Sequence, residues 1–291
     1  MEGYIVMHIS NRHLYAVIFV LGFITVLGIS VLYQQLHGAS EKREEIVVFA
    51  GAAAAPVYKE VARAFESKYN VKVTLHLGGS GTLLSTIEIT QTGDVYIPGS
   101  PEFLLAAREK GVVDFSEHPP KVLAYLVPAI IVQKGNPKNI SKIEDLTKPG
   151  VRVGLGDPEV VCIGLYAKEM LEKIGIWEGV YKNVVVYAAS CEHVAQLIYT
   201  GAVDAVIGWH VFYYWNPEKS DIVWIEPSKI TRIGYIAGAV TKFARNREWA
   251  LRFLDFLASE EAQGIWRKYG YFPTLEEAKK YAPSAEVEEL T

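Results

Sequence analysis

The chain has 291 residues, of which half are apolar and 12% aromatic, and its formal net charge is −4. This composition supports a sizeable hydrophobic core and excludes a chain that is disordered throughout. The slightly acidic charge, with no large cluster of Lys and Arg, provides no field that would attract nucleic acid. We therefore expect no nucleic-acid partner.

The first segment with a clear physical signal lies at residues 14–36. The 20 residues from Leu14 to Tyr33 carry no charge, which is long enough for a helix to cross a membrane. A cleaved signal peptide and a retained anchor both fit, but the stretch from His37 to Ser40 is a poor cleavage site. We expect residues 1–40 to be an N-terminal membrane anchor or signal segment, with the anchor favoured. The rest of the chain would then lie on the extracytoplasmic face of the cell membrane.

Strand and helix patterns alternate after a charged linker that precedes residue 46. Short apolar runs predict strands, and apolar residues at helical spacing predict helices. The predicted strands are residues 46–50, 71–77 and 94–97, and the predicted helices begin near Pro56, near Leu83 and at Pro101. This alternation indicates a parallel sheet with helices on both faces.

A second series of alternating elements starts at residue 127. Its predicted strands are 127–132, 151–155, 184–187 and 205–208, with one helix ending near 174 and another at 194–200. A strand at 234–240, helices at 248–257 and 260–269, and a solvated tail at 276–289 complete the chain. The layout predicts two α/β lobes, with a ligand at the carboxyl ends of strands and in the cleft between lobes.

The most informative stretch is residues 154–169. A buried strand ends in the turn Gly156-Asp157-Pro158, and the chain then enters a helix through small residues. The first N–H groups of a helix have no partner within the helix, so its N-terminus is suited to binding an anion. The thiol of Cys162 lies where such N–H groups should converge.

Several motifs between residues 46 and 273 share the order found in one known family. They are Val48-Phe49-Ala50-Gly51-Ala52, Ser80-Gly81-Thr82-Leu83, Gly93-Asp94-Val95-Tyr96-Ile97, Gly156-Asp157-Pro158-Glu159, Gly164-Leu165-Tyr166-Ala167-Lys168-Glu169 and the C-terminal run from Phe253 to Tyr271. Together they resemble type II periplasmic solute-binding proteins, and specifically the molybdate/tungstate-binding family of ABC importers.

The resemblance implies a two-lobed α/β fold, the periplasmic-binding-protein type II fold, with a ligand cleft between lobes and a transmembrane helix before it. Lobe 1 would take residues 45–127 plus 232–291 and lobe 2 would take 128–231. It also implies a monomer that delivers a small inorganic ligand to an ABC permease with its ATPase. Such a protein is not an enzyme, and its only bound group would be cargo such as molybdate or tungstate.

In that family, neutral hydrogen bonds from helix N-termini and hydroxyl groups hold a tetrahedral oxyanion. Carried over by position, the ligand contacts fall on Ala53, Ser80, Ile163, Val194 and Trp209. Ala53 stands where the family offers a Ser, so only its N–H remains. Trp209 stands where the family offers a Tyr, and an indole donates but cannot accept.

Six further residues are expected near the same place and define an alternative, namely Cys162, Cys191, Glu192, His193, Glu159 and His210. With the same fold, they would hold a soft metal cation or a thiophilic oxyanion such as arsenite. The two cysteines could also form a structural disulfide or remain inert buried thiols.

Glu192 has two interpretations of its own. It is either a helix N-terminal carboxylate or, as in the tungstate-binding branch, a ligand of the metal centre. A thiol enzyme is a third class of function. No nucleophile elbow, Walker loop or HExxH motif supports it.

Overall fold

The structure is a computed structural model that describes residues 19, 22, 23, 25 and 43–290. It divides the chain into two units, residues 1–44 and Glu45–Thr291. The predicted membrane segment at 14–36 lies almost entirely outside the described residues. Within the described part of the chain, no helix is long and apolar enough to cross a membrane.

The larger unit contains two five-stranded sheets, and each sheet with its helices forms one lobe. The sheet of lobe 1 has the strand order β2-β1-β3-β10-β4. Its elements are β1 (Glu45–Gly51), η1 (Ala52–Ala54), α2 (Ala55–Tyr69), β2 (Lys72–Gly78), α3 (Ser80–Thr90), β3 (Val95–Ile97), α4 (Pro101–Glu109), β4 (Lys121–Leu126), β10 (Gly234–Val240), α9 (Arg247–Leu257), α10 (Glu260–Lys268) and α11 (Leu275–Lys279).

The sheet of lobe 2 has the strand order β7-β6-β8-β5-β9. Its elements are β5 (Pro128–Gln133), η2 (Ile143–Thr147), β6 (Val153–Gly156), α5 (Cys162–Lys173), α6 (Trp177–Tyr181), β7 (Val184–Ala188), α7 (Cys191–Tyr199), β8 (Ala205–Trp209), α8 (Val211–Trp215) and β9 (Ser220–Val223), followed by η3 (Pro227–Lys229) on the way back to lobe 1.

Both sheets are mixed, which corrects the expectation of a purely parallel sheet. In lobe 1, β2, β1 and β3 are parallel, and β10 runs antiparallel to β3 and β4. Lobe 2 repeats this arrangement, because β5 runs antiparallel to β8 and β9. The antiparallel strand is β10 in lobe 1 and β5 in lobe 2. Each is the first strand after the chain crosses from the other lobe, and it runs opposite to the strands beside it.

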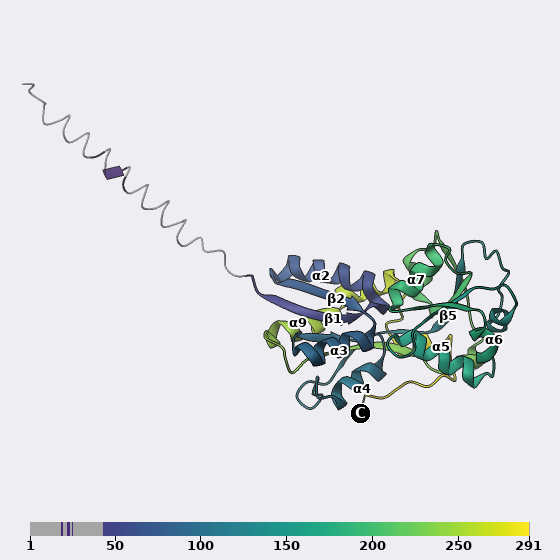
Figure 1. The fold of residues 1–291 in the computed structure, drawn as a ribbon. Coiled ribbons are helices and arrows are strands. Elements are labelled where there is room, and N and C mark those ends of the chain that lie inside the picture. The colour runs from purple at the N-terminus through teal and green to yellow at the C-terminus, as the bar shows by residue number, and fades with distance from the viewer. Residues whose placement is uncertain (1–18, 20–21, 24, 26–42, 291) are drawn as a thin grey trace, which may run out of the picture. The chain divides into compact units, whose positions relative to one another are not determined.

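Helices cover both faces of each sheet, as the alternating pattern predicts (Figure 1). In lobe 1, Phe65 of α2 packs edge-on against Phe253 of α9, with ring centroids 5.1 Å apart. The opposite face of that sheet forms a second apolar cluster, in which Leu84 and Ile87 of α3 lie with Leu104 of α4. Helices α7 and α5 lie on the two sides of the lobe 2 sheet. Each lobe therefore presents a rigid platform from which the connecting loops project.

The parallel strands of each lobe end at one edge of its sheet. In lobe 1, Gly51 of β1 lies opposite Gly78 of β2, and Ala50 lies opposite Ile97 of β3. In lobe 2, Gly156 of β6 lies opposite Ala188 of β7. The loops after these strands lead directly into η1, α3, α5 and α7. The carboxyl ends of parallel strands are where α/β folds bind ligands, so these loops are the first place to look for a site.

Two connections join the lobes. The first is the short link at Val127, and the second runs from residue 224 to residue 233. The C-terminal tail braces the second connection, because Glu286 N–H donates to Thr231 O at 2.9 Å and Ile233 N–H donates to Glu286 O at 2.9 Å. The predicted solvated tail is therefore tied down in part.

Candidate functional site

The carboxyl edges of the two sheets face each other and are in contact. Gly81 N–H, in the first turn of α3, donates to Val160 O of lobe 2 at 3.1 Å. A Cβ atom added to Gly79 would lie 2.6 Å from Ala189 O and 3.0 Å from Val160 O. Gly79 thus allows the α3 loop to lie directly against the two loops that open α5 and α7. The structure shows the lobes closed on one another at this point.

Ser80 begins α3 and is almost fully buried at the contact. Its Oγ accepts a hydrogen bond from Gly99 N–H at 3.0 Å, and its backbone carbonyl accepts one from Tyr96 Oη at 2.9 Å. A hydroxyl group has one donor and can accept two bonds, so Ser80 can still donate to a ligand. The structure therefore places this predicted contact residue at the lobe interface.

The thiols of Cys162 and Cys191 meet on the lobe 2 side. Their Sγ atoms lie 3.3 Å apart, and both side chains are buried and free. A disulfide requires a sulfur–sulfur distance of about 2.05 Å, so the predicted structural disulfide is not formed. Cys162 also faces lobe 1, because a Cβ atom added to Gly99 would lie 2.7 Å from its sulfur and 2.9 Å from the Cβ of Ala53.

The sulfur of Cys191 is surrounded by groups that influence its ionisation. Burial, and then the neighbouring Cys162 thiol, raise the pKa of Cys191 well above its usual value, whereas the Ile163 N–H and the Trp209 indole act in the opposite direction. These two predicted contact residues therefore point toward the thiol pair. Trp209 is fully buried, and its Nε1 has no well-formed hydrogen bond within the described part of the chain.

Two buried tyrosines that the sequence did not point to, Tyr58 and Tyr271, lie near the two thiols. Burial raises the pKa of both hydroxyl groups well above the usual range, with a further contribution from the two cysteines at Tyr58 and from Tyr58 at Tyr271. Tyr271 Oη donates to Ala53 O, whereas Tyr58 Oη has no partner among residues that the structure describes. Helical spacing places Tyr58 on the buried face of α2. An unpaired buried hydroxyl is costly, so this one is explained best by a ligand that accepts from it.

Of the two predicted backbone donors Ala53 and Val194, Val194 has its N–H bonded within its own helix. Val194 N–H is committed to Ser190 O at 3.0 Å, because Val194 lies far enough into α7 to make a bond within the helix. Ala53 lies in η1, fully buried, with its carbonyl already bonded to Tyr271. Val194 N–H is therefore not free in this structure, and Cys191 is the residue of the α7 N-terminus that lies at the thiol pair.

His210 is a structural residue between the lobes, not a ligand. It is fully buried, its Nδ1 accepts from Val127 N–H at 3.2 Å, and its Nε2 lies 2.8 Å from Gly270 O. Its ring also stacks on Phe272 at 4.4 Å between centroids. Burial lowers the pKa of His210 to about 4. Both nitrogens are occupied, so the imidazole cannot bind a metal as it stands.

The other members of the alternative set lie apart from the thiols. Glu159 and His193 are exposed, and Glu192 pairs with Lys59 of lobe 1 at 3.2 Å. Over the described residues, no group of three or more His, Cys, Asp and Glu side chains could hold a metal ion. The expectation that all six residues gather in one place is thus corrected: only the two cysteines meet.

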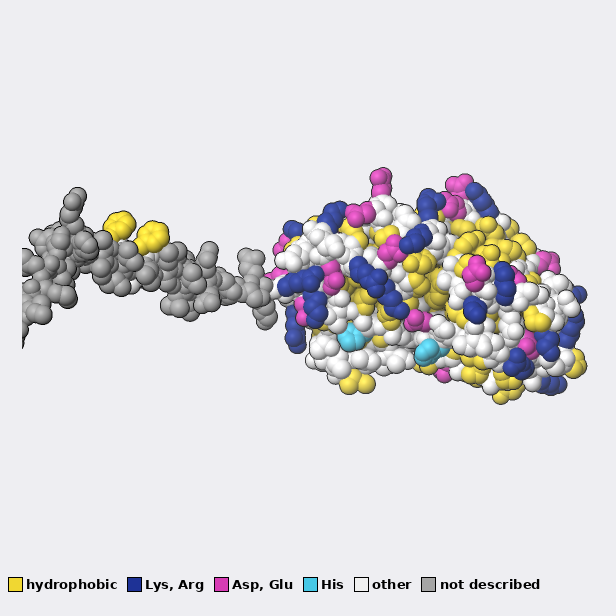
Figure 2. All heavy atoms as spheres, turned by 90° about the horizontal axis from the view of Figure 1, so that it is seen from above, with side chains coloured by type: hydrophobic (Ala, Val, Ile, Leu, Met, Phe, Trp, Pro, Cys, Tyr) yellow, Lys and Arg dark blue, Asp and Glu magenta, His cyan; other side chains and the backbone are white. Residues whose placement is uncertain are grey.

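Charged groups connect the lobes at the rim. Arg232, on the second connection, donates to Glu102 of α4 at 2.8 Å and to Glu169 of α5 at 3.0 Å. Tyr166 Oη of α5 donates to the same Glu102 oxygen at 2.9 Å. On the face seen in Figure 2, basic and acidic side chains are intermingled and do not gather by sign. Charge therefore joins the lobes locally, through Arg232 and its two glutamate partners.

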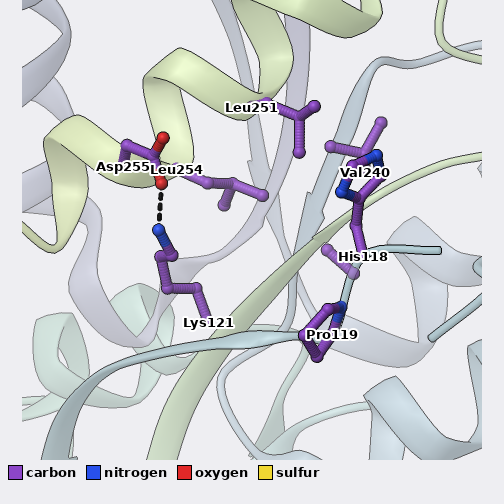
Figure 3. Close-up of a pocket in the computed structure, with 8 residues that line it drawn as sticks. His118, Pro119, Lys121, Val240, Leu251, Leu254 and Asp255 are labelled. Carbon is purple, nitrogen blue, oxygen red and sulfur yellow. Dashed lines mark hydrogen bonds and ion pairs between the residues drawn. The ribbon is translucent and has the colours of Figure 1, made fainter. Parts of the chain in front are cut away.

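A separate pocket of about 410 Å³ lies on lobe 1, away from the cleft (Figure 3). Leu251 and Leu254 of α9 and His118 line it, and an ion pair between Lys121 and Asp255 crosses one side. Its lining is mostly apolar, and the strand ends and helix N-termini described above take no part in it.

Comparison with known proteins gives a consistent result. A family model described as bacterial extracellular solute-binding protein matches residues 46–272. The molybdate-binding protein ModA of Escherichia coli is 24% identical over 257 residues, which cover 84% of this chain and 95% of that protein. A sulfate-binding protein of Synechococcus elongatus is 23% identical over 284 residues, 87% of this chain and 80% of that protein.

Solved structures agree on the fold. The sulfate-binding protein SubI of Mycobacterium tuberculosis superimposes with a TM-score of 0.73 at 18% identity, covering 84% of this chain and 93% of that one. The predicted resemblance to the molybdate-binding branch is confirmed by these comparisons.

Proposed function

The chain belongs to the family of bacterial extracellular solute-binding proteins, and from that premise we propose that it binds a tetrahedral oxyanion for an ABC importer. Molybdate or tungstate is the cargo that we propose first. The relatives named above for molybdate and sulfate support a tetrahedral dianion as the class of ligand. The protein would act on the extracytoplasmic face, with residues 1–40 as its proposed membrane anchor.

One observation carries this proposal. Two fully buried donors lie beside the two thiols: Tyr58 Oη has no hydrogen-bond partner in the part of the chain that the structure describes, and Trp209 Nε1 faces the Cys191 thiol without a well-formed hydrogen bond. Ser80 adds a third donor from the opposite lobe. None of these groups carries a formal charge. Buried polar groups are normally paired, so donors left over at a lobe interface indicate a ligand that accepts hydrogen bonds.

Neutral donors suit a transported anion. The N-termini of α3, α5 and α7 approach the site, and each carries a partial positive charge from its helix dipole. Partial charges and hydroxyl groups stabilise a dianion without a full counter-charge that would hold it too tightly for release. Binding between the lobes would favour the closed state by its differential affinity for that state. Opening would then release the anion to the permease.

Isothermal titration calorimetry of the full-length chain with molybdate, tungstate and sulfate tests the proposal. We expect one anion per chain, and we expect Ser80→Ala to weaken binding about tenfold, since hydrogen bonds to charged groups contribute roughly 1.5–3 kcal/mol. Ser116→Ala is the matched control, because that hydroxyl is exposed on lobe 1 and donates to Asp114 at the surface. Absence of binding heat with all three dianions would refute the proposal.

The alternative of a soft metal cation held by Cys and His is not favoured. Its histidines and glutamates do not reach the thiols, as described above. Of the residues in that alternative, only Cys162 and Cys191 lie together, and their pairing needs its own explanation.

A further inference from the structure

The thiol pair is the feature of the site that oxyanion binding does not explain. The chain contains only two cysteines, and they lie 29 residues apart in the sequence. The fold nevertheless brings their sulfur atoms to 3.3 Å at the start of two different helices, both in lobe 2. Neither sulfur serves a metal group in the described residues.

We propose that Cys162 and Cys191 form a reversible disulfide in the cleft wall, made by thiol–disulfide exchange when the lobes part. The sulfurs need to approach by only about 1.3 Å to reach a disulfide bond length of about 2.05 Å. Extracytoplasmic compartments favour such bonds, and the family places this chain in one. The inference depends on the two-lobed fold and not on which cargo is bound.

The structure also indicates which cysteine reacts first. Cys162 faces lobe 1 at Gly99, so separating the lobes uncovers its sulfur. Cys191 lies beside two groups of its own lobe, the Ile163 N–H and the Trp209 indole. In the closed state both thiols are buried, at 1% and 3% exposure, and no oxidant can reach them. Lobe opening therefore controls the reaction.

The exchange balances as two substitutions at sulfur. The Cys162 thiolate attacks a small external disulfide, forms a mixed disulfide and expels one thiolate of the reagent. The Cys191 thiolate then attacks the Cys162 sulfur and expels the second thiolate. The two cysteine protons end on the two reagent thiols, so the protein loses two hydrogens and the reagent is reduced. Forming the disulfide would move the Cys191 sulfur, which the Ile163 N–H and the Trp209 indole now face. The redox state of the cysteines would therefore change the surface that lobe 2 presents to the cleft.

The test uses the reduced full-length chain and 4,4′-dithiodipyridine, without any oxyanion. We expect two thiopyridones released per chain, no retained adduct, and a mass lower by two hydrogens that dithiothreitol restores. In Cys191→Ser, one thiopyridone should be released and one adduct should remain on Cys162. Two stable adducts on the native wild-type chain, or no reaction unless urea is added, would overturn the inference. Neither result bears on oxyanion binding, so the two proposals fail separately.

A second measurement tests the control by lobe opening. Arg232→Ala removes contacts to both Glu102 and Glu169 across the lobes, so we expect exchange to become roughly tenfold faster. Arg252→Ala is the matched control, because its contacts with Glu248 and with the Trp249 ring both lie within α9 and do not join the lobes. If Arg232→Ala and the wild type react at the same rate, lobe opening does not control the thiols.

Discussion

The lobes of this protein meet through buried contacts at the centre of the interface and charged contacts at its rim. At the centre, Gly79 and Gly81 lie against the backbone of lobe 2, and the nearby donors are neutral. At the rim, Lys59 pairs with Glu192 while both side chains remain well exposed. The difference indicates a division of roles, in which buried backbone contacts define the closed state and exposed ion pairs add little.

The largest effect should come from adding one methyl group at the centre. Gly79 has φ −66° and ψ 137°, which alanine adopts without strain, yet its Cβ would clash with two carbonyl oxygens of lobe 2 and with nothing comparable in lobe 1. We expect Gly79→Ala to weaken oxyanion binding about 100-fold, because overpacking costs roughly 1–3 kcal/mol in the closed state only. Calorimetry measures the affinity.

The matched control for that variant is Gly264→Ala in α10, where an added Cβ meets nothing within 4 Å. It should leave affinity unchanged. Equal affinities for the two variants would show that the Gly79 contact does not define the closed state.

The second largest effect should be a loss of folding stability in acid, caused by His210. The unfolded chain binds the imidazole proton with a pKa of 6.5 and the folded chain with a pKa of about 4. Between these values the unfolded state holds more protons, so stability is present above pH 6.5 and falls as the pH approaches 4. By linkage, His210 alone should cost roughly 2.5 kcal/mol between pH 7 and pH 4.5.

Urea unfolding at both pH values measures this cost, and His210→Gln, which cannot be protonated, provides the comparison. The wild type should lose more stability on acidification than the variant does. An identical loss in both would mean that His210 is not buried between the lobes as described.

Removing the unpaired hydroxyl at the centre should weaken binding without lowering the stability of the free protein. We expect Tyr58→Phe to weaken oxyanion binding roughly 20-fold, by about 1.8 kcal/mol, since a hydrogen bond to a charged group is lost. The free protein should be no less stable, because this hydroxyl has no partner within the described residues. Calorimetry and urea unfolding give the two values. Tyr181→Phe, at an exposed ring on α6, is the control.

The smallest effect belongs to the exposed ion pair between Lys59 and Glu192. Lys59→Ala should change affinity by less than about 1 kcal/mol, because exposed ion pairs contribute little and are screened by salt. Titrations at low and high salt check this. A loss as large as that of Gly79→Ala would contradict the division between centre and rim.

Local patterns were sufficient to predict much of the fold. Alternating apolar runs located most strands and helices, and Pro56 correctly marked the first turn of α2. Strands β4 and β9 were not predicted, and the antiparallel directions of β5 and β10 depend on how the chain crosses between lobes. No local sequence signal encodes that crossing.

The sequence predicted the position of a site residue only where that position depends on one local strand-to-helix loop. Ser80 and Cys162 each open a helix after a strand, so their place at the cleft could be expected. The unpaired state of Tyr58 depends on lobe 2, which contributes the thiols beside it. His210 finds its partners 83 and 60 residues away, and Glu192 finds Lys59 at a distance of 133 residues. Such pairings arise only in three dimensions.

The central claim is that neutral donors between the lobes hold the oxyanion. Anomalous scattering from a crystal grown with tungstate locates the tungsten directly. The account predicts one strong peak between the lobes, within hydrogen-bonding reach through its oxygens of Tyr58 Oη, Trp209 Nε1 and Ser80 Oγ. A tungsten peak elsewhere on the protein, with these three groups in no contact with the anion, would contradict it.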